Sequence, residues 1–322
     1  MAPTTRRDGQ GEETALSVDR RGLPRLARLC HNPKSPFSER SGNQNQRLDV
    51  GIAPPMPIIR AERAVISVHL LPSLIPPGGL HGGVAVVIDV LRASTMMVHA
   101  LVAGCTAVMP CGEVDEARRL AASLPEGSAL LAGERHGVPI EGFDLGNSPG
   151  ECTPAVCQGK TMVITTTNGT RALLACLDAD PVVVGSFVNF AATSQRLLHE
   201  ARPIHLVCAG TEGRVSYEDT LLAGAFAKHF KDLDHRMAND EAEIAAGLWA
   251  RVEDMIWFKS GKRVQVEETN PLVRYLIRGQ GGRRVVELGL SADIADAGRL
   301  NRPDYQIVAE LRRNPLRIVA CP

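Results

Sequence analysis

Three segments of this chain share one pattern, in which a continuous apolar run is followed by a polar loop and then by helical spacing. They are VAVVIDVLRAST at residues 84–95, TMVITTTNGTRA at 161–172 and IHLVCAGTEGRVSYEDT at 204–220. An unbroken apolar run is typical of a strand that is covered on both faces. Because such strands alternate with helices here, the sequence predicts an α/β fold. We expect a mostly parallel or mixed sheet with helices on both faces.

The rest of the chain fits one folded region that follows a polar extension. Residues 1–55 are rich in Arg, Gly, Pro, Asn, Ser and Gln and lack apolar periodicity, so we expect a disordered N-terminal extension there. Residues 56–322 are expected to fold, and a division into two α/β halves near 56–235 and 236–322 stays open. The stretch near 235–275 is predicted to be mainly helical, and the tail to hold at least one strand and a short helix.

Composition excludes several classes of partner. Lysine plus arginine equals aspartate plus glutamate, at 36 each among 322 residues, so the chain has no global attraction to nucleic acid or to an anionic membrane. Aromatic residues make up 4%, which argues against a base-stacking surface. The sequence has no apolar run near the roughly 20 residues that span a bilayer. The eight cysteines form no CxxC pair, and with no signal peptide we expect a cytoplasmic protein.

Polar groups gather where the predicted strands end. In an open parallel sheet, ligands bind beyond the carboxyl ends of the strands, where helix N-termini also point. Asp89 ends the first of the three strands, and Glu218 and Asp219 follow the third. A further long loop, GERHGVPIEGFDLGNSP at 133–149, contains four glycines and three carboxylates. Loops of this length inside a compact domain tend to be functional.

The carboxylates of these loops are candidate metal ligands. Grouped carboxylates repel one another unless a cation lies between them, and oxygen ligands without Cys or His spacing suit Mg²⁺. The candidate ligands are Asp89, Glu134, Asp144, Glu218 and Asp219. The simpler interpretation is that Asp89 caps the next helix and that Glu134 and Asp144 hold loop turns.

Arginines and small polar residues in the same loops suit a bound phosphate or sulfonate. The candidate substrate-binding residues are Arg92, Ser94, Thr95, Arg135, Asn147, Thr167, Asn168, Gly169, Thr170 and Arg171. Together with a metal they indicate phosphoryl chemistry, for which the candidate catalytic residues are Asp89, Arg92, Glu134 and Asp144. Asp89 could act as metal ligand, base or nucleophile. We favour a metal ligand, because no DxD spacing supplies the second acid that an aspartyl-phosphate route needs.

Four of these segments resemble one known family. IDVLRAST, GERHGVPIEGFDLGNSP, TTTNGTRA and CAGTEG with YEDTLLAG occur in the same order as in the 2-phosphosulfolactate phosphatase (ComB) family, over roughly residues 60–312. The resemblance implies an α/β fold peculiar to that family and a Mg²⁺-dependent phosphoric monoester hydrolase. Its reaction would convert 2-phospho-3-sulfolactate to 3-sulfolactate and phosphate, a step of coenzyme M biosynthesis.

Two other functions stay open at this point. One is a phosphatase of another small phosphorylated hydroxy acid, and the other is a non-catalytic module that binds anions. In each case we expect a small anionic partner, phosphorylated and sulfonated if the resemblance extends to substrate. Nucleic acid and membrane are not expected partners, and a homo-oligomer stays open.

Overall fold

The computed structural model describes residues 63–260 and 270–321, with the backbone alone for 256–260. These residues belong to one compact unit, residues 59–322. The predicted N-terminal extension, residues 1–55, lies outside the described residues. Within the described part, no helix is both long enough and apolar enough to span a bilayer.

Ten strands form one sheet in the described part of the chain. They are β1 (Ile66–His69), β2 (Val84–Ile88), β3 (Ala107–Pro110), β4 (Ala129–Arg135), β5 (Val138–Pro139), β6 (Thr161–Thr165), β7 (Val182–Gly185), β8 (Ile204–Cys208), β9 (Val308–Arg313) and β10 (Leu316–Cys321). The helices are α1 (Ala93–Val102), α2 (Val114–Ala122), α3 (Pro154–Cys157), α4 (Gly169–Ala175), α5 (Phe190–Leu197), α6 (Tyr217–Asp232), α7 (Asp240–Ser260), α8 (Pro271–Leu276), α9 (Gln280–Glu287) and α10 (Ser291–Ala297), with short 3-10 turns η1 (Pro72–Leu74) and η2 (Pro149–Glu151).

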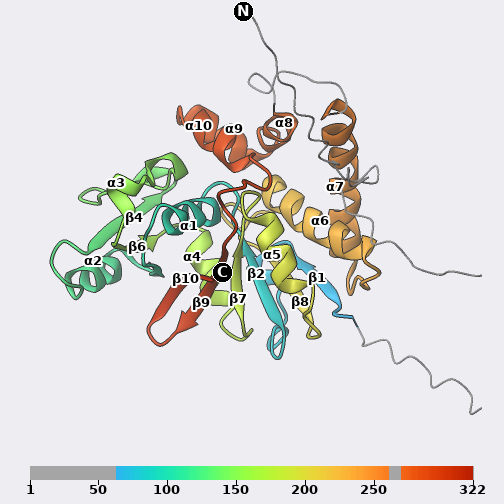
Figure 1. The fold of residues 1–322 in the computed structure, drawn as a ribbon, viewed down its shortest axis with the longest axis horizontal. Coiled ribbons are helices and arrows are strands. Elements are labelled where there is room, and N and C mark those ends of the chain that lie inside the picture. The colour runs from blue at the N-terminus through green and yellow to red at the C-terminus, as the bar shows by residue number, and fades with distance from the viewer. Residues whose placement is uncertain (1–62, 261–269, 322) are drawn as a thin grey trace, which may run out of the picture. The chain divides into compact units, whose positions relative to one another are not determined.

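The sheet contains two parallel blocks that are joined by an antiparallel hairpin. Its order is β1-β8-β2-β7-β9-β10-β3-β6-β4-β5. Strands β1, β8, β2 and β7 pair in parallel, as do β3, β6 and β4. The hairpin β9–β10 pairs antiparallel with β7 on one side and with β3 on the other. The predicted α/β fold with a mixed sheet is therefore confirmed, and the tail of the chain lies inside the sheet (Figure 1).

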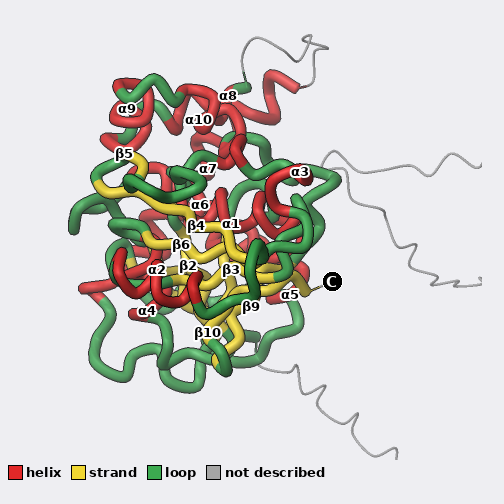
Figure 2. Tube along the Cα trace, turned by 90° about the vertical axis from the view of Figure 1, so that its left-hand side faces the viewer, coloured by secondary structure: helices red, strands yellow, loops and turns green. Residues whose placement is uncertain are grey.

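Helices cover both faces of the sheet, as the unbroken apolar runs predicted. Alternate residues of β2 point to opposite sides: Val86 and Ile88 pack in the cluster that contains α6 and α7, while Ala85 and Val87 pack with α1 and α4. Every residue of β2 is buried. In Figure 2 the strands run through the middle of the molecule, with helices around them. A strand that is buried on both faces gains from apolar side chains at every position, which explains VAVVI.

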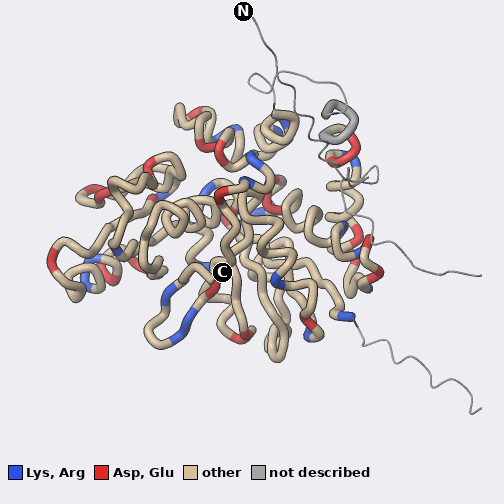
Figure 3. The backbone as a smooth tube through the Cα atoms, in the orientation of Figure 1, with Lys and Arg blue, Asp and Glu red and all other residues tan. Residues whose placement is uncertain are grey.

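Local signals set the helix boundaries that matter for the site. The side chain of Ser216 accepts a hydrogen bond from the backbone of Asp219 and so caps α6. Asn270 caps α8 in the same way, and Pro271 occupies the first position of that helix. Helix α10 packs against α8 and α9, and these two helices pack against α6. Charged residues of both signs are spread over helices and loops, while the central strands are nearly uncharged (Figure 3).

A pair of glycines tests how closely α6 and α7 pack. A Cβ atom at Gly224 of α6 would clash with the backbone carbonyl of Ala245 in α7, whereas a Cβ at Gly247 of α7 would meet nothing within 4 Å. Gly224→Ala should lower the free energy of unfolding by about 1–3 kcal/mol because the helices must separate. Gly247→Ala should raise it by about 0.5–1 kcal/mol because alanine favours helix. Urea unfolding of both variants measures this, and equal stabilisation by both would contradict the packing.

Candidate active site

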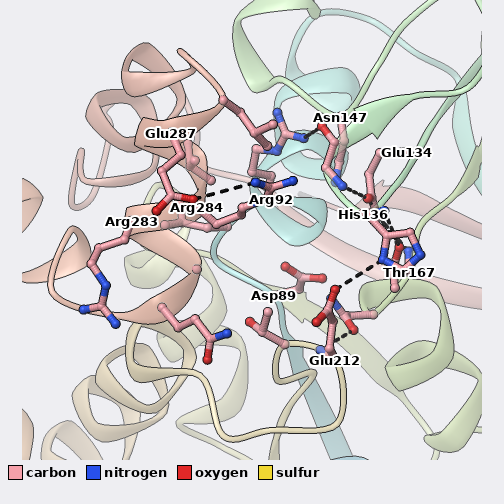
Figure 4. A pocket seen from close by; sticks show the side chains of 18 residues that line it. Asp89, Arg92, Glu134, His136, Asn147, Thr167, Glu212, Arg283, Arg284 and Glu287 are labelled. Carbon is pink, nitrogen blue, oxygen red and sulfur yellow. Dashed lines mark hydrogen bonds and ion pairs between the residues drawn. The ribbon is translucent and has the colours of Figure 1, made fainter.

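A cavity of about 430 Å³ opens where several loops and α9 meet (Figure 4). The loop after β2, the end of β4, the loops after β6 and β8, and α9 all contribute to its lining. Its polar and charged lining residues are Asp89, Arg92, Glu134, His136, Asn147, Thr167, Asn168, Thr211, Glu212, Gln280, Arg283, Arg284 and Glu287. Figure 4 shows Asp89 on one side of this space and Arg92 with Arg284 on the other. Six of the predicted site residues therefore share one cavity: Asp89, Arg92, Glu134, Asn147, Thr167 and Asn168.

Asp89 is fixed directly after β2 by the backbone around it. Its Oδ1 accepts a hydrogen bond from Ala93 N at 3.3 Å, and its own N donates to Ser94 Oγ at 2.6 Å. A Cβ atom at Gly169 would lie 2.7 Å from Asp89 Oδ2, so glycine is required for α4 to approach this closely. Burial raises the pKa of Asp89 to about 7, and the nearby Glu134 and Glu218 add to the effect.

The adjacent acids of α6 differ in their surroundings. Asp219 accepts hydrogen bonds from Val90 N at 2.8 Å and from Gly210 N at 3.0 Å, so it joins the loops after β2 and β8. Glu218 is buried, and its Oε2 has no hydrogen-bond partner. A Cβ atom at Gly281 would clash with the Glu218 carboxylate, so the start of α9 lies directly on this side chain. Burial raises the pKa of both carboxyls, most strongly for Asp219, where Asp89 is the next cause.

Glu134 connects the end of β4 to the loop after β6. Its Oε1 accepts from Thr167 N at 2.8 Å, and its Oε2 accepts from Gly137 N at 2.6 Å and from Thr167 Oγ1 at 3.3 Å. Three donors from two loops therefore surround one buried carboxylate. Its role in the structure is to hold these loops at the cavity wall.

Arg92 lies on the opposite wall and is almost fully buried. Its Nη1 donates to Asp293 Oδ2 at 2.8 Å and to Ser148 Oγ at 3.1 Å, and its Nη2 donates to Gly137 O at 3.2 Å. Asp293 belongs to α10, in the tail of the chain. The predicted anion-binding arginine is thus already paired with a carboxylate.

Nine predicted residues do not line the cavity, among them Glu218 and Asp219, whose surroundings are described above. Asp144 is exposed, and its Oδ2 accepts from Leu131 N at 2.8 Å; it holds a loop turn and does not join the other carboxylates. Arg171 is exposed on α4. Arg135 donates to Thr165 Oγ1 at 2.9 Å and to Glu134 O at 2.8 Å, so it braces β4. Asp144 is therefore not placed to bind a metal with the other carboxylates, and Arg135 and Arg171 are not placed to bind substrate in this cavity.

Three more are buried hydroxyl residues that form hydrogen bonds within the protein. Ser94 Oγ accepts from Asp89 N, and Thr95 Oγ1 donates to Val90 O at 2.8 Å. Thr170 Oγ1 accepts from Thr166 N at 3.1 Å. These contacts stabilise the strand-to-helix turns. Gly169, also predicted to bind substrate, allows the close approach of α4 to Asp89 instead.

Sequence reasoning missed the contribution of the tail. Arg283, Arg284 and Glu287 come from α9, whose start is the glycine-rich stretch GQGG. Figure 4 shows Arg283 projecting away from the other labelled side chains, and its Nη1 donates to the carbonyl of Arg278. Arg284 pairs with Glu287 at 3.7 Å. The sequence signal that could have predicted this contribution is GQGGRR, in which glycines precede two adjacent arginines.

The balance of charge around the cavity favours carboxylates. Arg92 is neutralised by Asp293 and Arg284 by Glu287. Burial raises the pKa of Asp89, and the nearby carboxylates of Glu134 and Glu218 raise it further. The unpartnered oxygen of Glu218 and the crowding at Asp89 fit a divalent cation. Among the described residues, no three Asp, Glu, His or Cys side chains are placed to share one ion. A cation here would therefore take at most two of these carboxylates, with water or substrate as its other ligands.

Comparison with known proteins gives a consistent result. The family model described as 2-phosphosulpholactate phosphatase matches residues 69–314. A probable 2-phosphosulfolactate phosphatase of Caldanaerobacter subterraneus subsp. tengcongensis is 35% identical over 232 residues, which cover 72% of this chain and 89% of the relative. A protein of the same description from Synechococcus sp. strain WH7803 is 45% identical over 168 residues, covering 52% of this chain and 68% of the relative.

The raised pKa of Asp89 makes stability depend on pH. The folded protein binds the Asp89 proton more tightly than the unfolded chain, so this stabilising contribution is present near pH 4 and is lost as pH rises to about 7. Asp89→Asn has no such loss. With EDTA present, the free energy of unfolding of Asp89→Asn relative to the unsubstituted protein should rise by about 3 kcal/mol between pH 5 and 8. Denaturant unfolding measures this difference, with Asp144→Asn as the control; a pH-independent difference would contradict the burial of an ionisable Asp89.

Proposed function

The chain belongs to the 2-phosphosulpholactate phosphatase family, and we propose that it hydrolyses 2-phospho-3-sulfolactate to 3-sulfolactate and phosphate with Mg²⁺ as cofactor. Members of this family are phosphoric monoester hydrolases, and the descriptions of the relatives support this activity here. The proposal includes a cytoplasmic location and a reaction of the kind used in coenzyme M biosynthesis.

The observation that carries the proposal is the crowding of Asp89 and Glu218 beside a cavity that also contains arginines. A phosphomonoester that bears a carboxylate and a sulfonate brings about four negative charges into this space. Such a ligand would be repelled by the carboxylates if no cation were bound. A divalent ion between Asp89 and Glu218 would offset that repulsion and attract the phosphoryl group.

Each side chain then has a separate task. Asp89 and Glu218 would hold the cation, which when bound supplies charge stabilisation to the phosphoryl oxygens and activates water. Arg92 would donate its remaining N–H groups to the phosphoryl oxygens. Asn147 Oδ1 is buried without a partner and can accept a hydrogen bond from the hydroxyl of 3-sulfolactate.

Arg284 is the residue that we expect to bind the sulfonate of the substrate. It lies on the α9 side of the cavity, and its pairing with Glu287 at 3.7 Å is long and partly exposed, so a sulfonate could compete for the guanidinium. Arg284 also comes from an element separate from those that hold Asp89 and Glu134. The phosphoryl and sulfonate groups could therefore be bound at opposite ends of the cavity.

A phosphate-release assay tests the reaction and its metal requirement. With 2-phospho-3-sulfolactate and Mg²⁺ the protein should turn over, and EDTA should abolish turnover. Asp89→Asn should lower kcat by about 10²-fold or more, since a ligand of the cation is lost. Arg171→Ala, an exposed arginine outside the cavity, is the control and should keep the original rate. Full activity in EDTA would exclude the metal, and full activity of Asp89→Asn would exclude its role.

A panel of substrates tests whether the protein recognises the sulfonate group. The protein should prefer 2-phospho-3-sulfolactate to 2-phospholactate, which lacks the sulfonate. Arg284→Ala should raise KM for the sulfonated substrate by about tenfold, because a charge-assisted hydrogen bond is lost, and should leave KM for 2-phospholactate nearly unchanged. Equal effects on the two substrates would place the sulfonate elsewhere. If the protein hydrolyses other phosphorylated acids but not 2-phospho-3-sulfolactate, the proposed substrate is wrong.

A further inference from the structure

The ion pair between Arg92 and Asp293 connects the cavity to the tail of the chain. The two side chains are 5% and 6% exposed, and Arg92 Nη1 lies 2.8 Å from Asp293 Oδ2. They are separated by 201 positions in the sequence, so only the docking of α10 brings them together. A buried charged pair of this kind is strongly oriented because neither partner can exchange for water.

Ser148 completes the arrangement around the guanidinium. Its hydroxyl donates to Asp293 Oδ2 at 2.8 Å and accepts from Arg92 Nη1 at 3.1 Å. On the other side, Gly137 O accepts from Arg92 Nη2 at 3.2 Å. Three acceptors from three separate segments therefore set the plane of the guanidinium. Its position is determined by the protein before any ligand arrives.

The same guanidinium borders the large cavity and a smaller one of about 240 Å³. Asp293 and Ser148 hold Nη1 from the side of α10 and η2, and Arg92 lines the large cavity together with Asp89. A buried ion pair is often no more stabilising than an apolar pair of similar size. A role in stability alone therefore explains the pair poorly.

We propose that Asp293 is a positioning residue that orients Arg92 toward the phosphoryl group during hydrolysis, which rests on the function proposed above. The pair is neutral overall, so Arg92 supplies directed hydrogen bonds with little net charge. Directed donors favour a transition state of defined geometry over tight binding of the phosphate product. By this assignment, α10 is part of the catalytic apparatus although it contributes no group that touches the substrate.

Asp293→Asn tests the proposal with the side-chain shape retained. Losing the charged partner should let the guanidinium shift, and kcat should fall by about 10–100-fold while KM changes by less than about threefold. Asp296→Asn is the matched control, because Asp296 lies on the same helix and pairs with Arg299 near the surface at 3.5 Å. It should keep the original kcat. An unchanged kcat in Asp293→Asn, or a loss confined to KM, would overturn the assignment.

Rescue by free guanidinium separates positioning from a general effect on folding. Arg92→Ala leaves Asp293, Ser148 and Gly137 O around an empty space of guanidinium size. Added guanidinium at about 50 mM should restore kcat of Arg92→Ala by about tenfold or more, while methylammonium should not. The double variant Arg92→Ala/Asp293→Asn should show no rescue. Equal rescue in both variants would overturn the role of Asp293.

Thermal unfolding provides a readout that does not depend on the substrate. Guanidinium should raise the Tm of Arg92→Ala relative to an equal concentration of methylammonium, and should not do so in the double variant. If no phosphorylated acid is hydrolysed but this shift occurs, the proposed function fails while Asp293 is still shown to orient a guanidinium. If the unsubstituted protein is active, and guanidinium binds Arg92→Ala without restoring its turnover, the catalytic part of the proposal is wrong.

Discussion

Burying several carboxylates side by side is unfavourable, and the site is organised around that cost. Asp219 offsets it by accepting hydrogen bonds from Val90 N and Gly210 N, which also joins the loops after β2 and β8. Glu134 does the same between β4 and the loop after β6. Asp89 and Glu218 remain less fully compensated, and Glu218 has an oxygen without a partner. The remaining charge gives the cavity its affinity for a cation, and a bound cation in turn makes an anionic substrate acceptable.

The C-terminal part of the chain completes the site that the loops after the strands form only in part. Its hairpin β9–β10 lies between the two parallel blocks, helices α8 and α9 pack on α6, and α10 packs on α8 and α9. Helix α9 places Gly281 against Glu218, and α10 places Asp293 against Arg92. Both walls of the site therefore depend on contacts with helices from the tail of the chain, and Arg92 and Asp293 are 201 positions apart. Docking of these helices is a condition for the site to exist.

Sequence reasoning located the strand ends but not the long-range contacts. The apolar runs at 84–88 and 204–208 predicted buried strands correctly because full burial leaves a local signal. The place of β9–β10 inside the sheet could not be predicted, because strand order depends on pairing between distant segments. Residue type alone predicts Arg171 and Asp144 as site residues, but the direction in which each side chain points is set by tertiary packing. Asp293 sits in SADIADA, which reads locally as an ordinary short helix.

The central claim is that Asp89 and Glu218 hold a divalent cation at the wall of the cavity. Diffraction from crystals grown with Mn²⁺, measured at the manganese absorption edge, tests it most directly. We expect an anomalous peak about 2.1–2.3 Å from a carboxylate oxygen of each residue, with water or a bound phosphate among the other ligands. A saturating Mn²⁺ concentration that gives no peak between these two side chains, or a peak bound only elsewhere, would contradict the account.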